Sequence, residues 1–190
     1  DLSAFEVKAR NLANEKLSRP PYSALSDTDG GKYVCNELVD EAVKISSGMY
    51  QQLKNSSFVF SEAERAGEIN LSDGIKVYGR IDESGDMVRV IDYKTGSIDA
   101  AASSYYSGKK LQLPLYLLAV SAGKRAVGAY YFPASVLYSD KSDGVFRLQG
   151  FMDCSDDVVC ASDKNVQPKT KSSYVNANYQ GKQLENTLMH

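Results

Sequence analysis

The 190-residue sequence has only three cysteines, one histidine and almost no excess of either charge. An odd and sparse set of cysteines disfavours a disulfide framework and fits a reducing compartment, so we expect a cytoplasmic protein. With 22 Lys and Arg against 24 Asp and Glu, the formal net charge is −2. This near-neutral charge argues mildly against a free-standing DNA-binding protein, which usually has an excess of basic residues. It argues less against a fragment whose DNA channel is completed by other domains.

Long hydrophobic segments are also missing from the chain. No basic region followed by an apolar run opens the sequence, and the longest apolar run, 111–122, is interrupted by Gln112 and Pro114. That run is too short to span a bilayer, so we expect no association with a membrane. The hydrophobic fraction of 43% is ordinary for a globular protein. The chain begins at Asp1 rather than Met, which favours a piece of a longer protein.

Three segments carry apolar side chains every three or four residues and are predicted to be helices: 2–17, 32–54 and 105–122. Residues 20–31 are rich in Pro, Ser, Asp and Gly and are predicted to form a loop. Pro114 lies inside the third helical segment, where an interior proline costs about 3 kcal/mol. We therefore expect a kink at this residue.

Strands are predicted where apolar residues alternate, or β-branched residues gather, between turn residues. These segments are 56–65, 74–82, 87–94 and 125–132, with an edge strand at 146–150. From 156 onward the chain is polar, and only short helical pieces are expected. The main elements follow the order α-β-β-β-α-β, which is typical of the α/β class. We expect an N-terminal helical segment (1–55), a core (56–150) and a C-terminal polar extension (151–190), all within one domain.

Two of the expected strands form a hairpin that carries two carboxylates and one ammonium group. The first strand ends in Gly79-Arg80-Ile81-Asp82, and the second ends in Ile91-Asp92-Tyr93-Lys94. So short a loop requires antiparallel pairing. Because residues i and i+2 share a face, Asp92 and Lys94 point the same way and Tyr93 points the other way. Asp82 is expected beside Asp92, which a register centred on the turn allows only if the ladder frays or bulges.

Two neighbouring carboxylates repel each other unless a cation lies between them. Hard oxygen ligands favour Mg²⁺ or Mn²⁺, and the backbone carbonyl of Tyr93 is a further candidate ligand. Such a metal activates water for attack on a phosphodiester, while Lys94 stabilises the developing negative charge. A bare Asp-x-Lys triplet is usually a solvated surface pair. The preceding apolar run, the following Thr-Gly turn and the second strand ending in Asp82 favour a catalytic pair of Asp92 and Lys94 instead.

The helix that follows the hairpin carries two polar residues within an apolar stretch. Gln112 and Tyr116 are four residues apart and therefore lie on one helical face. They mark either a helix edge at the core boundary or a contact with the phosphate backbone or the attacking water. Lys109 and Lys110 precede them and are candidate contacts to DNA phosphates.

Together, three blocks resemble the RecB/AddB branch of the PD-(D/E)xK nucleases: residues 79–82, 91–96 and 108–116. The resemblance implies a restriction-endonuclease-like α/β core with a mixed central sheet flanked by helices. It also implies the C-terminal nuclease domain of the B subunit of an ATP-dependent helicase–nuclease. Such an enzyme has an A-type partner subunit and resects double-stranded DNA ends for recombinational repair. The site residues implied are Asp82 and Asp92 as metal ligands, Lys94 as the catalytic lysine, Gln112 and Tyr116 as the helix motif, and Glu64 as an accessory acidic residue.

The sequence departs from this family in three respects. The family usually has a metal-ligating histidine on its first helix, whereas the single histidine here is His190. Either the chain begins after that helix or this member lacks the ligand. The hairpin is also shorter than usual. Finally, the iron–sulfur cluster of AddB-type nucleases needs four cysteines, and Phe151 stands where a partner of Cys154 and Cys160 is required. We therefore expect ordinary thiols here, with a cluster at most elsewhere in the parent protein.

The leading hypothesis is metal-dependent hydrolysis of DNA phosphodiesters within a larger repair enzyme. The shortened hairpin and the missing histidine motivate a second hypothesis, a non-catalytic DNA-binding or scaffold domain that keeps the nuclease fold. A third is a free-standing exonuclease of the same superfamily, for which the native reading frame lacks an upstream helicase-like region.

Overall fold

The computed structural model describes residues 1–63, 66–67, 75–76, 79–99, 101–135, 146–153, 155–165 and 175–176. The chain divides into two compact units, the first comprising residues 1–52 with Ser135, and the second comprising residues 53–134 and the described residues from 146 onward. The boundaries expected from the sequence, at residues 55 and 150, stay a prediction. No helix in the described part of the chain is long and apolar enough to cross a membrane.

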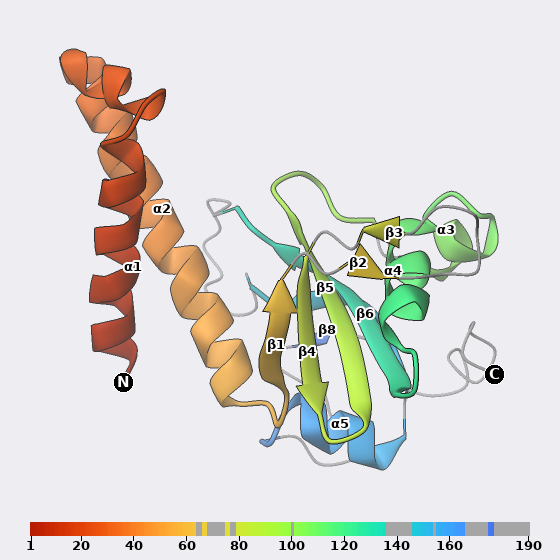
Figure 1. The fold of residues 1–190 in the computed structure, drawn as a ribbon. Coiled ribbons are helices and arrows are strands. Elements are labelled where there is room, and N and C mark those ends of the chain that lie inside the picture. The colour runs from red at the N-terminus through yellow and green to blue at the C-terminus, as the bar shows by residue number, and fades with distance from the viewer. Residues whose placement is uncertain are drawn as a thin grey trace. The chain divides into compact units, whose positions relative to one another are not determined.

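The first unit is a helical hairpin, drawn in red and orange in Figure 1. It contains α1 (Leu2–Leu17), the short 3₁₀ helix η1 (Tyr22–Asp27) and most of α2 (Asp29–Lys54). Both long helices were predicted, and η1 lies in the segment expected to be a loop. The ring centroids of Phe5 and Tyr50 lie 4.9 Å apart, and Arg10 forms a 2.7 Å ion pair with Asp40. These contacts hold α1 against α2.

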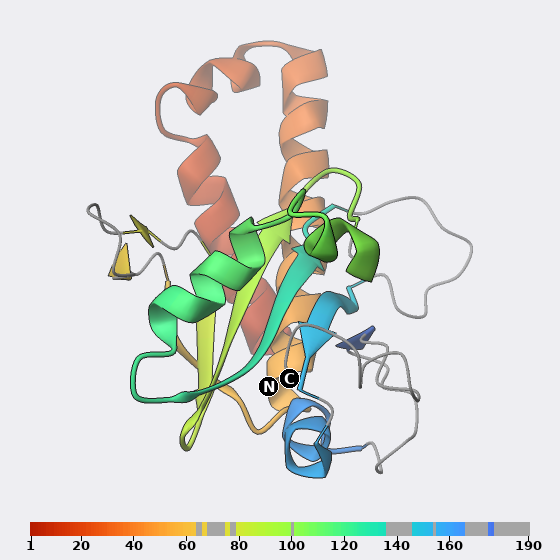
Figure 2. The same cartoon turned by 90° about the vertical axis from the view of Figure 1, so that its right-hand side faces the viewer.

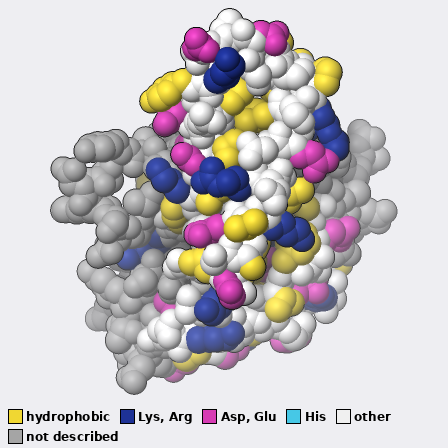
Figure 3. Space-filling view, turned by 90° about the vertical axis from the view of Figure 1, so that its left-hand side faces the viewer, with side chains coloured by type: hydrophobic (Ala, Val, Ile, Leu, Met, Phe, Trp, Pro, Cys, Tyr) yellow, Lys and Arg dark blue, Asp and Glu magenta, His cyan; other side chains and the backbone are white. Residues whose placement is uncertain are grey.

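The surface of this hairpin mixes apolar and charged side chains. Figure 3 shows lysine, arginine and acidic groups interspersed with apolar ones over the helices. Val7, Leu12 and Tyr33 are among the exposed apolar residues. On the face that Figure 3 shows, charges of both signs alternate over the helices, so this face offers no concentrated field for a DNA backbone.

The second unit is built on a mixed sheet, as the sequence predicted. Its described strands follow the spatial order β1-β4-β5-β6-β7-β8. Pairing is antiparallel for β1–β4, β4–β5 and β6–β7 and parallel for β5–β6 and β7–β8. The strands are β1 (Val59–Ala63), β4 (Arg80–Ser84), β5 (Met87–Lys94), β6 (Arg125–Pro133), β7 (Leu148–Met152) and β8 (Val175–Asn176). The short strands β2 (Ala66–Gly67) and β3 (Ile75–Lys76) pair separately. The expected edge strand corresponds to β7, which lies between β6 and β8.

The single kinked helix expected over 105–122 is two helices, α3 (Ala102–Tyr106) and α4 (Gln112–Val120). Gly108 ends α3 at a φ of +72°, and the N–H of Lys109 reaches back to the carbonyl of Ser104 at 3.1 Å. This is a Schellman cap, which favours glycine because the left-handed conformation crowds a Cβ. Pro114 is the third residue of α4, where its missing N–H costs no helical hydrogen bond. The helical segment is therefore interrupted before the proline, and α4 has no kink at Pro114.

One face of the sheet packs against α4, which Figure 2 shows lying across β5 and β6. Val88 and Val90 of β5 and Ile81 of β4 meet Leu113 and Leu117 of α4 in this core. The remaining helix, α5 (Asp156–Ser162), is tied to the segment before β1 through the Ser57 N–H and the Ala161 carbonyl at 2.7 Å. The sheet and α4 together fix the carboxyl end of β5 next to the first turn of α4.

Candidate active site

The carboxyl end of β5 carries an ion pair between Asp92 and Lys94. The Lys94 Nζ lies 2.8 Å from Asp92 Oδ2, with the side chains of Lys94 and Asp92 37% and 10% exposed respectively. Both residues follow the buried positions Val88 and Val90 along the strand, so alternation places them on the face that packs against α4. Asp92 and Lys94 therefore point to the same side of the strand, as predicted.

The first turn of α4 extends this pair into a connected network. Lys94 Nζ donates to Gln112 Oε1 at 3.3 Å, and Gln112 Nε2 donates to the Tyr116 hydroxyl at 3.1 Å. The spacing of four residues puts Gln112 and Tyr116 on one helical face, as predicted. Four of the expected site residues thus lie together, from Asp92 through Lys94 and Gln112 to Tyr116.

The network keeps the Lys94 ammonium charged and partly accessible. The hydrogen bond to Asp92 is the largest influence and raises the pKa of Lys94 above its ordinary value, while partial desolvation opposes it. The ammonium forms an ion pair with Asp92 and donates one hydrogen bond to Gln112, so its three N–H donors are not all used. At 37% exposure the remaining donor can face an anionic ligand.

Tyr131 on β6 belongs to the same site and was not predicted. The Lys94 Nζ lies 5.3 Å from the centroid of its ring. Tyr131 pairs with Asp92 in the parallel β5–β6 ladder and is almost completely buried. Burial raises the pKa of its hydroxyl, and the neighbouring Lys94 opposes that rise. In the sequence Tyr131 is simply a tyrosine within an apolar strand, and this pattern does not indicate that it lies next to Lys94.

Asp82 does not join this network, which corrects the expected meeting of the two carboxylates. In the β4–β5 ladder Asp82 pairs with Arg89 and Ile81 pairs with Val90, with no bulge between them. Since Ile81 and Val90 face α4, Asp82 faces the other side of the sheet. The register is the one centred on the turn, and that register separates Asp82 from Asp92.

Asp82 is instead fully buried between two arginines. Its Oδ2 accepts hydrogen bonds from Arg80 Nη2 at 2.9 Å and from Arg89 Nε and Nη2 at 3.0 and 2.9 Å. The guanidinium of Arg89 also lies 4.1 Å from the ring centroid of Phe58. Burial lowers the pKa of Arg89, and Asp82 opposes that change. The negative charge of Asp82 thus partly offsets the positive charges of the two buried guanidinium groups.

The described residues do not amount to a metal site. Within the described ranges no group of three or more His, Cys, Asp or Glu residues is arranged to hold a metal ion. Asp92 is the carboxylate of the network, and the predicted ligand role of the Tyr93 carbonyl stays a prediction. Glu64, Cys154 and His190 lie outside the described residues.

Two lysines and two cysteines lie outside the network. Lys109 is exposed and Lys110 is half-buried, and both attract Asp99, whose pKa is lowered mainly by a hydrogen bond from Ser104. Their contact with DNA stays a prediction. Cys35 and Cys160 carry free thiols.

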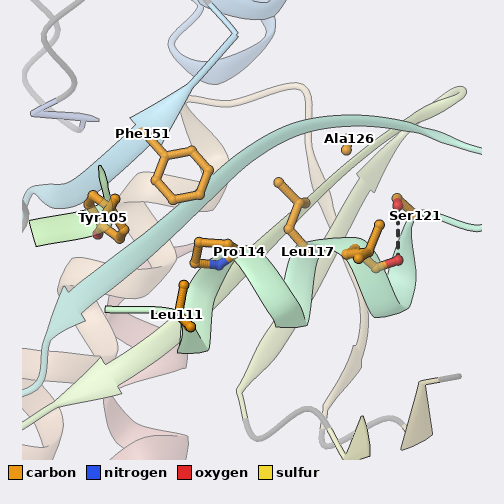
Figure 4. Close-up of a pocket in the computed structure, with 8 residues that line it drawn as sticks. Tyr105, Leu111, Pro114, Leu117, Ser121, Ala126 and Phe151 are labelled. Atoms are coloured by element: carbon orange, nitrogen blue, oxygen red, sulfur yellow. Dashed lines mark hydrogen bonds between the residues drawn. The ribbon is translucent and has the colours of Figure 1, made fainter. Parts of the chain in front are cut away.

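The opposite face of α4 lines an apolar pocket of about 340 Å³. Figure 4 shows Leu111, Pro114 and Leu117 of α4 beside Phe151 and Tyr105. The rings of Tyr105 and Phe151 meet edge to face with centroids 5.1 Å apart. Helix α4 therefore presents its polar side to Lys94 and its apolar side to this pocket.

Comparison with known proteins agrees with the resemblance seen in the sequence. A relative from Clostridium tetani, named as the B subunit of an ATP-dependent helicase/deoxyribonuclease, is 31% identical and covers 75% of this chain and 14% of its own length. Proteins of the same name from Caldanaerobacter subterraneus subsp. tengcongensis and Clostridium perfringens are 29% and 27% identical, over 82% and 94% of this chain and 17% and 19% of their own lengths. The chain thus spans less than a fifth of these relatives. The sequence profile described as the PD-(D/E)XK nuclease superfamily matches residues 8–180. With this match and a mixed sheet flanked by helices, the chain belongs to the PD-(D/E)XK nuclease superfamily.

Proposed function

We propose that this chain is the nuclease domain of a helicase–nuclease B subunit and hydrolyses phosphodiester bonds in DNA. The observation that carries the proposal is the continuous contact from Asp92 through Lys94 and Gln112 to Tyr116. These four residues come from the blocks that resemble the nucleases. The relatives are named as B subunits of a helicase/deoxyribonuclease, which supports the same activity and implies DNA and an A-type partner subunit.

Lys94 is the group that meets the phosphate in this proposal. Asp92 favours its charged form and its side chain is 37% exposed, so it stabilises negative charge that develops on a phosphoryl oxygen. Gln112 holds the ammonium from the other side and is itself held by Tyr116. This preorganisation matters because a long lysine side chain is otherwise free to rotate away.

A dependence on Mg²⁺ or Mn²⁺ stays part of the proposal, since nucleases of this superfamily use divalent metals. The support from this chain is the Asp92 carboxylate on β5, next to which the Tyr93 carbonyl of the same strand is a candidate ligand. A functional assay in Mg²⁺, in Mn²⁺ and in chelator tests this part separately from the role of Lys94.

The test is strand cleavage by the assembled parent enzyme on linear double-stranded DNA labelled on either strand. Lys94→Ala is expected to reduce cleavage of at least one strand by about 10²–10³-fold, which is typical for loss of one charge-stabilising donor. Lys164→Ala is the matched control, because Lys164 is also exposed in the second unit but lies outside the network. Cleavage of both strands at the wild-type rate by Lys94→Ala contradicts the proposal.

One observation favours a second candidate, a DNA-binding or scaffold domain without catalysis. Asp82, the carboxylate that the resemblance assigns to the metal, is held by Arg80 and Arg89 on the far side of the sheet. Complementation of a repair-deficient strain by the full-length Lys94→Ala protein decides between the two. Full rescue favours the scaffold, and failure to rescue by a folded variant favours the nuclease.

A further inference from the structure

The Lys94 ammonium lies between three groups contributed by three elements. Asp92 Oδ2 of β5 lies 2.8 Å from Lys94 Nζ, and Gln112 Oε1 of α4 lies 3.3 Å from it. The ring of Tyr131 on β6 forms the third side, with its centroid 5.3 Å from Nζ. The first two contacts belong to the motifs already described, whereas the third comes from a strand that those motifs do not include.

Tyr131 is more deeply buried than the other members of the site. It is 3% exposed and belongs to the core that also contains Val90, Leu113 and Ala129. The parallel ladder pairs it with Asp92, so the ring and the carboxylate leave the sheet side by side on the same face. Gln112 and Tyr116, by contrast, are only partly buried.

We propose that Tyr131 is a positioning residue for Lys94, whose aromatic ring holds the ammonium between Asp92 and Gln112. An aromatic face attracts a cation, and the attraction strengthens where the ring is shielded from water. Lysine has a flexible four-carbon stem, so a fixed third side narrows the positions of its charged end. The inference rests on the proposed nuclease function for its catalytic consequence, but not for the contact itself.

The proposed contact with Lys94 involves the ring of Tyr131 and not its hydroxyl group. Variants that remove one or the other therefore test it. Tyr131→Phe keeps the ring and should retain cleavage within about 3-fold of wild type. Tyr131→Leu removes the ring and should lower kcat about 10-fold or more with little change in KM, because substrate binding by the rest of the parent enzyme is untouched. Tyr105→Leu is the control for a merely structural effect, since Tyr105 is buried in the same core and lines the pocket behind α4.

A second readout follows the contact without requiring activity. In nuclear magnetic resonance spectra of this chain, the Lys94 Cε protons should show an upfield ring-current shift in wild type and Tyr131→Phe. That shift should disappear in Tyr131→Leu and persist in Tyr105→Leu. Persistence of the shift in Tyr131→Leu overturns the proposed contact.

The outcomes separate this inference from the proposed function. If Lys94→Ala cleaves both strands normally, the nuclease role of the site fails, whatever Tyr131 does. If Lys94→Ala is inactive but folded Tyr131→Leu and Tyr105→Leu lose equal activity, only the positioning role of Tyr131 is overturned. Selective loss of kcat in Tyr131→Leu, with Tyr131→Phe active, supports it.

Discussion

At the scale of single residues, the site depends on how Lys94 is held. Asp92 forms an ion pair with its ammonium, Gln112 accepts a hydrogen bond from it, and the ring of Tyr131 lies beside it. None of these contacts neutralises the lysine, because the nearby carboxylate favours its charged form. The result is a fixed positive charge at the end of β5.

The protonation of Lys94 provides the first prediction. Its pKa is raised from the ordinary 10.5, with Asp92 as the largest cause. A raised folded-state pKa means that the ion pair contributes stability below pH 10.5 and loses it as pH rises through the higher folded-state value. Asp92→Asn removes that cause, so the ammonium should titrate at lower pH than in wild type. Equal midpoints for Lys94 in the two proteins, measured by nuclear magnetic resonance, contradict this electrostatic assignment.

Asp82 provides the second prediction. Asp82→Ala leaves Arg80 and Arg89 buried without the carboxylate they share, so the free energy of unfolding should fall by about 3–5 kcal/mol. Asp86→Ala is the control, because Asp86 is exposed in the turn and should change stability by at most about 0.5 kcal/mol. Urea unfolding measures both. A carboxylate kept close to Asp92 would instead repel it in the metal-free protein, so unchanged or increased stability of Asp82→Ala contradicts the structure.

At the scale of elements, the approach of the Gly79 backbone to β5 fixes the strand that bears Asp92. Gly79 has a φ of +149°, and a Cβ added there would lie 2.4 Å from the Ile91 carbonyl oxygen. Only glycine fits, because both the conformation and the close backbone contact exclude a side chain. The backbone geometry next to the site therefore explains why the 79–82 block begins with glycine.

Gly79→Ala should consequently destabilise the protein by about 1–3 kcal/mol, the usual range for a strained backbone position. Gly96→Ala is a matched control two residues beyond Lys94, since a Cβ there meets no atom within 4 Å. Thermal unfolding compares the two variants. Equal melting temperatures for Gly79→Ala and Gly96→Ala contradict the close approach seen at β5.

Local periodicity predicted much of this arrangement and failed where long-range register decides. The rules for residues i, i+2 and i, i+4 placed Asp92 with Lys94 and Gln112 with Tyr116. They could not place Tyr131, because its position beside Asp92 depends on a parallel pairing between strands far apart in the sequence. The face of Asp82 depended on a one-residue choice of hairpin register. The apolar spacing runs on across the break between α3 and α4, which depends on the positive φ of Gly108 and not on Pro114.

At the scale of the whole molecule, the chain is a small part of its relatives' length and has a net charge of −2. A nearly neutral domain gains little affinity from non-specific attraction to the DNA backbone. Under the proposed nuclease function, we therefore expect the rest of the parent enzyme to present DNA to Lys94, with phosphate contacts from Lys109 and Lys110. This proposal assigns substrate delivery to the parent and charge stabilisation to the network.

The proposed contact of Lys109 and Lys110 with DNA phosphates can be measured through the salt dependence of DNA binding. If Lys109 and Lys110 each contact a phosphate, replacing both by alanine should reduce the slope of log K against log salt by about 2 for the parent enzyme. Lys164→Ala should leave the slope unchanged. An unchanged slope in the double variant removes these lysines from the DNA interface.

The most direct test of the central claim is cleavage of linear double-stranded DNA by the assembled parent enzyme carrying Lys94→Ala. Each strand is labelled separately, and DNA unwinding is followed in the same reaction. The nuclease assignment predicts that unwinding continues while cleavage of at least one strand falls by about 10²–10³-fold. Wild-type cleavage of both strands by the folded Lys94→Ala enzyme would contradict it.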